Sequence, residues 1–144
     1  MWTPMKILVP TDGSASALRA AKYAAKLLAD DEHGRITLLS VHDDEAFRRV
    51  RKYVPKGAIA DYIRELSETE LKPARAALDR AGVAHDMVMR TGAVAQEIVK
   101  LGHSGGFDLI VMGTKGRSAF GDLLMGSVAQ KVLSATQLPV TFIK

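Results

Sequence analysis

The chain has no cysteine in its 144 residues, which excludes a disulfide framework, thiol chemistry and metal sites built from thiolates. Aromatic residues make up only 6%, and they do not alternate with basic residues as a platform for stacking nucleic-acid bases would require. No apolar run approaches the roughly 20 residues that a membrane-spanning helix needs. The N-terminal residues also lack the pattern of a signal peptide, so we expect a cytoplasmic protein.

What is present is the composition of an ordinary globular protein, with 47% apolar and 25% charged residues. A chain of this length can bury about two-thirds of its unfolded surface, so we expect residues 1–144 to form one domain. Lysine and arginine outnumber aspartate and glutamate by 20 to 16, and a net charge of +4 can assist binding of an anionic ligand. The basic residues are spread out apart from a cluster within residues 48–52, so specific nucleic-acid binding is not expected.

Short apolar runs alternate with helical patterns along the chain, which is typical of an α/β fold with a parallel sheet covered on both faces. The predicted strands cover residues 6–10, 35–42, 85–90, 109–113 and 139–143. The fourth of these runs is continuously apolar, as a central strand that is buried on both faces should be.

Apolar residues at helical spacing predict the helices between these strands. The predicted helices cover residues 14–29, residues 58–81, a stretch from Val94 to Leu101, and a stretch that begins near Gly126 or Ser127. Pro73 lies inside the second helix and should kink it or break it in two. Residues 43–57 are charged and unpatterned, which predicts a long connection that either covers a ligand or only returns the chain to the helix layer.

A glycine-bracketed loop is the strongest functional feature. Gly113-Thr-Lys-Gly116 follows the predicted central strand, and after nine further residues Gly126-Ser127 begins the last helix. Glycine permits a positive φ and lets backbone N–H groups approach a phosphate closely. The first N–H groups of a helix also favour an anion, so both ends of the loop suit a phosphate.

Charge within the same loop supports this interpretation, because Lys115 and Arg117 could add positive charge to a polyphosphate site. The alternative is an ordinary strand-to-helix turn in which Ser127 only caps the helix. The loop is not a P-loop, because the order Gly-x-x-x-x-Gly-Lys-Ser/Thr is absent. The dinucleotide fingerprint Gly-x-Gly-x-x-Gly does not follow the first strand either.

A second feature, Pro-Thr-Asp-Gly-Ser at residues 10–14, ends the first strand. Asp12 could accept hydrogen bonds from ribose hydroxyls or help to hold a metal bound to phosphate. The same residues also suit the start of a helix, and both roles can hold together. Ligands of open α/β sheets bind beyond the carboxyl ends of the strands where the winding reverses, so the two loops would face one crevice if the first and fourth strands are neighbours.

No set of Ser, His and Asp or of Cys and His points to nucleophilic catalysis, so no catalytic residue is assigned. Hydrolysis would lack a positioned base unless Asp12 or His42 orients a water molecule. The remaining histidines, His33, His85 and His103, have no metal-ligand spacing, and no metal site built from protein groups alone is expected.

Three stretches resemble the ATP-binding branch of the universal stress protein family, and the resemblance extends over nearly the whole chain. They are Ile-Leu-Val-Pro-Thr-Asp-Gly-Ser at residues 7–14, Asp-Leu-Ile-Val-Met-Gly at residues 108–113, and the spacing Gly-x2-Gly-x9-Gly-Ser. The resemblance implies a three-layer sandwich of the adenine nucleotide alpha hydrolase-like type, with a five-stranded parallel sheet in the order 3-2-1-4-5 and helices on both faces.

The resemblance also implies which residues would hold ATP. Those expected to bind it, together with Arg117 from the loop's charge, are Pro10, Thr11, Asp12, Val41, Met112, Gly113, Gly116, Gly126, Ser127 and Val128. Mg²⁺ or Mn²⁺ could arrive with the triphosphate, coordinated largely by phosphate oxygens and water. The family further suggests a homodimer formed through the last strand, from Pro139 to Ile143, and an exposed apolar edge strand favours such pairing independently.

We therefore expect an ATP-binding regulatory or stress-response module that is at most a slow ATPase. One alternative is a nucleotide-activating or phosphotransfer enzyme, because related α/β folds host such enzymes. Another is a dimeric interaction module that binds no nucleotide.

Overall fold

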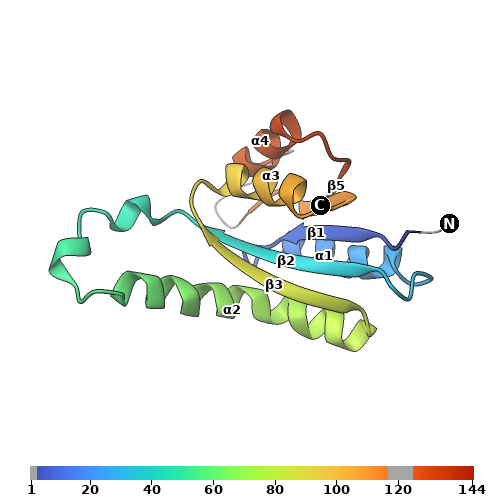
Figure 1. The fold of residues 1–144 in the computed structure, drawn as a ribbon, viewed down its shortest axis with the longest axis horizontal. Helices are drawn as coiled ribbons and strands as arrows, with labels where there is room; N and C mark the ends of the chain where they lie inside the picture. The colour runs from blue at the N-terminus through green and yellow to red at the C-terminus, as the bar shows by residue number, and fades with distance from the viewer. Residues whose placement is uncertain (1–2, 117–124) are drawn as a thin grey trace.

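The computed structural model describes residues 3–116 and 125–144, which form a parallel sheet with helices on both of its faces (Figure 1). The five strands lie in the order β3-β2-β1-β4-β5, which confirms the predicted fold class and strand order. Their bounds are β1 Lys6–Pro10, β2 Arg35–His42, β3 Ala84–Thr91, β4 Leu109–Gly113 and β5 Val140–Ile143. Strands β1, β2 and β4 match the prediction, β3 is one residue longer at each end, and β5 begins one residue later.

The helices form the two outer layers of the sandwich. Their bounds are α1 Ala15–Leu27, α2 Ala58–Ala81, α3 Val94–Ser104 and α4 Ser127–Ala135. Helices α1 and α2 pack on one face of the sheet, and α3 and α4 pack on the other. The sheet therefore separates two hydrophobic clusters, as the continuous apolar strands predict.

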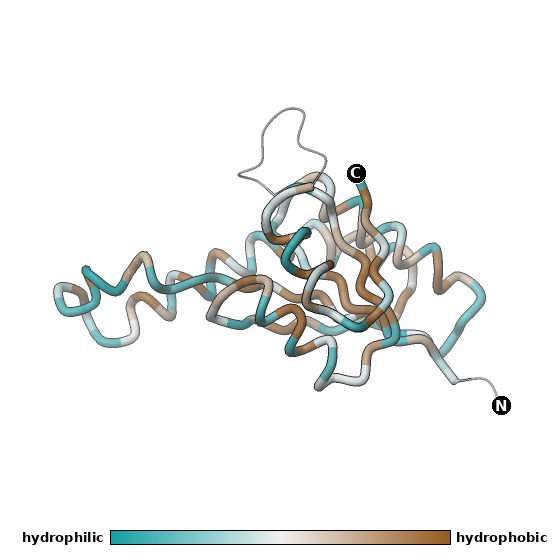
Figure 2. Tube along the Cα trace, turned by 90° about the horizontal axis from the view of Figure 1, so that it is seen from above, coloured by the Kyte–Doolittle hydropathy of each residue, from teal (hydrophilic) through white to brown (hydrophobic). Residues whose placement is uncertain are grey.

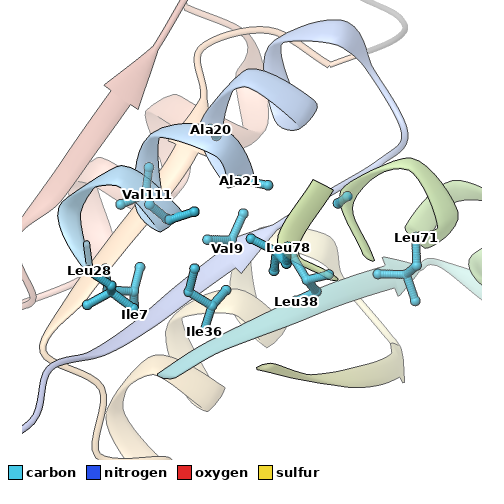
Figure 3. Close-up of a cluster of buried hydrophobic side chains, with 13 residues drawn as sticks. Ile7, Val9, Ala20, Ala21, Leu28, Ile36, Leu38, Leu71, Leu78 and Val111 are labelled. Carbon is cyan, nitrogen blue, oxygen red and sulfur yellow. The ribbon is translucent and has the colours of Figure 1, made fainter. Parts of the chain in front are cut away.

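The cluster under α1 and α2 joins strand side chains to both helices, as Figure 3 shows. Ile7 and Ile36 are fully buried against α1, whose alanines allow the helix to lie close to the sheet. Leu71 and Leu78 of α2 are also fully buried in this cluster. Burial of a leucine side chain contributes about 1.5–3 kcal/mol, so this face anchors α2 along its second half.

Helix α2 runs without a break through Pro73, so of the two expected effects, a kink or a break, the break into two helices is wrong. Proline removes one backbone donor and leaves the carbonyl four residues earlier, that of Thr69, without its helical partner. Both Pro73 and Thr69 are exposed, so water can satisfy that carbonyl. Packing of Leu71 and Ala74 against the sheet holds the helix together on the other side.

The connection over residues 43–57 is not unpatterned, because it contains the short 3-10 helices η1 Asp44–Phe47 and η2 Arg51–Tyr53. Together with the first turns of α2 it extends away from the sheet in both views (Figures 1 and 2). The Phe47 ring meets the Tyr62 ring of α2 edge-on, with 5.8 Å between the ring centroids. This contact ties the connection to α2.

Candidate functional site

A cavity of about 500 Å³ opens at the carboxyl ends of β1, β2 and β4. This volume is within the range of small-molecule binding sites. Strands β1 and β4 are neighbours, whereas their following helices, α1 and α4, cover opposite faces of the sheet. The cavity thus lies at the switch point where open α/β sheets bind their ligands.

All the predicted site residues that the structure describes line this cavity. They are Pro10, Thr11, Asp12, Val41, Met112, Gly113, Gly116, Gly126, Ser127 and Val128. Arg117 lies outside the described residues. The loop after β1 and the glycine-bracketed loop after β4 are therefore brought together on one wall. No residue of the 43–57 connection lines the cavity, so that segment does not cover it in this structure.

The loop after β1 is held by its own side chains and by the neighbouring strand. Thr11 donates its backbone N–H to the Leu39 carbonyl at 2.8 Å, which continues the β1–β2 pairing. Asp12 Oδ1 accepts from the Ser14 backbone N–H at 2.9 Å, and Ser14 Oγ accepts from the Ala17 N–H at 3.2 Å. Ser14 is therefore the N-cap of α1, and Asp12 stabilises the turn before it.

Two glycines of the second loop, Gly113 and Gly116, are needed for space, and neither they nor Gly126 have a positive φ. Positive φ values occur at other glycines, so that part of the expectation is wrong for Gly113, Gly116 and Gly126. A Cβ on Gly113 would collide with the Ser16 side chain, and one on Gly116 would lie 2.6 Å from Asp12 Oδ2. Without side chains at these two positions the end of β4 can lie against the first turn of α1, and the loop that follows can lie against the β1 loop.

The glycine-bracketed loop closes on itself with short hydrogen bonds. The Gly126 N–H donates to the Thr114 carbonyl at 2.7 Å, which joins the two ends of the loop. Ser16 Oγ of α1 donates to the Lys115 carbonyl at 2.7 Å and fixes the loop to the first helix. The Gly126 N–H is therefore occupied, and an anion would have to use the N–H groups that follow it.

The first turn of α4 forms part of the cavity wall. Gly126 is the N-cap residue and makes no side-chain capping hydrogen bond, so the alternative that Ser127 is an ordinary N-cap is wrong. Ser127, Val128 and Ala129 all line the cavity. Helix N-termini that lack a side-chain cap leave N–H groups and the positive end of the helix dipole to a ligand.

The cavity has one apolar wall and polar ends. Apolar side chains from the sheet, α3 and α4 form the wall, namely Leu39, Val41, Val94, Ile98, Met112, Val128 and Ala129. The polar end at β4 and β1 carries Lys115 and Asp12. A ligand that combines a flat apolar part with an anionic part fits this division.

Two further polar residues in the wall, Glu70 and His42, were not assigned from the sequence. Glu70 of α2 is only 7% exposed, and its Oε2 lies 3.3 Å from Nε2 of His42 at the end of β2. A signal existed, because Glu70 stands at a helical position where the spacing calls for an apolar residue. Such a buried carboxylate needs a partner or a ligand.

Within residues 3–116 and 125–144, no three His, Asp or Glu side chains gather as they would around a metal ion. Over the same residues no helix has the length and hydropathy to span a bilayer.

Comparison with known proteins agrees with this architecture. The model of the universal stress protein family matches residues 4–144. The universal stress protein MJ0531 of Methanocaldococcus jannaschii is 32% identical, over 96% of this chain and 81% of its own length. The solved structure of MJ0577, a universal stress protein of the same organism, superposes with a TM-score of 0.84 at 27% identity and covers 97% of this chain and 95% of that one.

A second similar structure is a universal stress protein in complex with cAMP, with a TM-score of 0.66, 24% identity, and coverage of 97% of this chain and 96% of that one. At this identity the likeness concerns the fold. The family match, by contrast, extends over almost the whole sequence. The chain belongs to the universal stress protein family.

Proposed function

We propose that this protein binds ATP in the cavity above β1, β2 and β4, and that it acts as a regulatory nucleotide-binding module in a stress response. The observation that carries the proposal is the close approach of two loops at the switch point, with Gly116 beside Asp12 Oδ2 and the uncapped start of α4 next to them. A helix N-terminus that favours phosphate and a carboxylate that suits ribose hydroxyls thus line one cavity.

The triphosphate would lie on the β4 loop and the first turn of α4. Gly113 and Gly116 let the loop backbone approach it, and the N–H groups of Ser127 and Val128 suit its charge, with Gly126 at the helix start. Outside the described residues, Arg117 would add charge to the same end.

Adenosine would extend from the phosphate end toward β2. Asp12 suits the ribose hydroxyls, and Val41 with Met112 belongs to the apolar wall where the base would lie. Pro10 and Thr11 would contact the adenosine from the carboxyl end of β1. The apolar residues of this wall favour a nucleoside over a free phosphate.

The proposed ligand includes Mg²⁺ or Mn²⁺, held mainly by phosphate oxygens and water. Asp12 is a carboxylate of the cavity wall with a second oxygen directed toward the loop, so it fits a hard cation bound to phosphate. The residues that line the cavity hold and orient a nucleotide. We assign none of them to catalysis and propose slow hydrolysis at most.

We further propose that the protein is a cytoplasmic homodimer formed through β5. This strand is an edge of the sheet and pairs with β4 on one side. Its residues Val140, Phe142 and Ile143 are half-buried within one copy. An apolar edge strand is a template for pairing with a second copy.

Calorimetric titration with MgATP tests the proposed function. We expect saturable binding to the wild type and its loss in Gly126→Val, because the new side chain would occupy the phosphate end. A Cβ at residue 126 meets its nearest atom at 3.5 Å, an ordinary contact, so the variant should fold.

Ala93→Val is the matched control, because Ala93 is the N-cap of α3 and does not line the cavity. It should bind MgATP as the wild type does. cAMP, which carries one phosphate on the same nucleoside, should bind more weakly than ATP. If the wild type shows no binding of any adenine nucleotide at millimolar concentration, the nucleotide-free interaction module replaces this proposal.

A further inference from the structure

The pair formed by Glu70 and His42 stands at the end of the cavity opposite the phosphate loop. Both residues line the cavity. The Nε2 atom of His42 is buried and lies 3.3 Å from Glu70 Oε2, but the two are not aligned as a hydrogen bond, and Nε2 has no other hydrogen-bond partner among the described residues. The Nε2 atom of His42 therefore lies against the carboxylate without a hydrogen bond.

The strand order sets how far this pair is from the phosphate loop. His42 ends β2, whereas Gly113 ends β4, and β1 lies between these strands. Neighbouring strands are about 4.8 Å apart, so the two ends of the cavity are separated by about 10 Å. A nucleotide with its phosphates on the β4 loop would place its base near β2.

Glu70 and the apolar wall line the same cavity from opposite faces of the sheet, because α2 packs on one face and α3 on the other. Leu39 and Val41 of β2 and Ile98 of α3 belong to the apolar wall of the same cavity. The Glu70 carboxylate adds acceptor oxygens to the cavity from the side of α2, so the edge of a flat ring on the apolar wall would face it. Glu70 thus presents acceptor atoms at this end of the cavity.

A second buried polar pair joins α2 to β2 one helical turn before Glu70. Ser40 Oγ donates to Ser67 Oγ at 3.1 Å, and both residues are almost fully buried. Ser40 precedes His42 by two residues on β2, and Ser67 precedes Glu70 by three on α2, so both pairs join the same faces of the strand and the helix. The distance of α2 from β2 is thereby fixed beside the cavity.

On the basis of the nucleotide site proposed above, we propose that Glu70 determines base specificity and that His42 positions it. Glu70 accepts a hydrogen bond from an exocyclic amino group of the base, and this selects a 6-aminopurine. A 6-oxopurine would bring a carbonyl oxygen against the carboxylate, so two acceptors would face each other. Sites that hydrogen-bond a polar group of the ligand discriminate strongly against analogues that lack it.

The test compares ATP, ITP and purine riboside triphosphate by calorimetry. For the wild type we expect ATP to bind at least about tenfold tighter than the other two, because a hydrogen bond to a charged group is lost with each. In Glu70→Gln the amide can donate to the O6 atom of ITP, so the preference for ATP over ITP should fall to about threefold or less. His42→Ala should lower the preference by a smaller factor.

Glu68→Gln is the matched control, because Glu68 is an exposed carboxylate on the same helix. It should keep the wild-type preference. Equal binding of ATP and purine riboside triphosphate by the wild type would overturn the inference without any variant, as would an unchanged preference in folded Glu70→Gln. In both cases ATP still binds, whereas failure of the wild type to bind any nucleotide would contradict the proposed function itself.

Discussion

At the scale of single residues, the site depends on two glycines that let the end of β4 and its loop touch the β1 loop and the first turn of α1. Gly113 lies against Ser16, and Gly116 lies against Asp12. Both contacts are between segments that are far apart in the sequence and that meet because β1 and β4 are neighbours. The glycine spacing in the sequence therefore reports a packing requirement of the fold as well as a phosphate site.

Gly113→Ala should destabilise the protein by about 1–3 kcal/mol, because the added methyl group overlaps Ser16 and overpacks a tight contact. The hydrogen bond from Ser16 to the Lys115 carbonyl would be strained as well. Urea unfolding measures the change. Gly126→Ala is the control and should change the free energy of unfolding by less than about 1 kcal/mol, since space is available there. Equal losses in both variants would contradict the packing argument.

Asp12→Asn separates the two roles of that residue. The amide oxygen can still accept from the Ser14 N–H, so the free energy of unfolding should change by about 0.5 kcal/mol or less. ATP affinity should fall about tenfold, because the charge that would assist the metal and the ribose is lost. Calorimetry with the folded variant checks this. A variant with full ATP affinity would leave Asp12 with only its turn-forming role.

At the scale of elements, the strands could be predicted because buried parallel strands are continuous apolar runs, and β4 is the clearest case. The course of α2 could not, because local propensity at Pro73 competes with packing of Leu71 and Ala74 on the sheet, and packing decides. The 3-10 turns of the 43–57 connection could not be predicted either. They depend on particular contacts such as that of Phe47 with Tyr62.

Pro73→Ala should stabilise the protein by about 1–3 kcal/mol, because the exposed helix regains the hydrogen bond to the Thr69 carbonyl. The greater freedom of the unfolded chain offsets part of this gain. Chemical denaturation of the variant beside Lys72→Ala, a substitution at the exposed neighbouring residue, provides the measurement. A loss of stability in Pro73→Ala would show that the helix depends on proline at this position.

At the scale of the whole molecule, most of the cavity wall could be predicted, because the carboxyl ends of neighbouring parallel strands meet at one edge. Asp12 and Gly113 are such strand-end residues. Glu70 could not be placed, because its entry into the cavity depends on how α2 packs against β2. Only its position on the apolar stripe of the helix indicated burial.

Thr141→Lys should shift the proposed homodimer toward monomer, because pairing through β5 would bring two added charges together at the edge. Thr141 is half-buried, and the long side chain of lysine can extend to solvent from such a position, so the fold should be retained. Light scattering after gel filtration gives the mass. Thr69→Lys, at an exposed position on α2, should leave the dimer intact. A dimer that persists in Thr141→Lys would point to another interface.

The central claim, that ATP binds where the β1 and β4 loops meet, is tested most directly by recording backbone amide NMR shifts while MgATP is added. We expect the largest changes at Asp12, Gly116 and the first turn of α4, with smaller ones at Val41, and little change over residues 43–57. No saturable change at millimolar MgATP, or changes confined to residues 43–57, would contradict the claim.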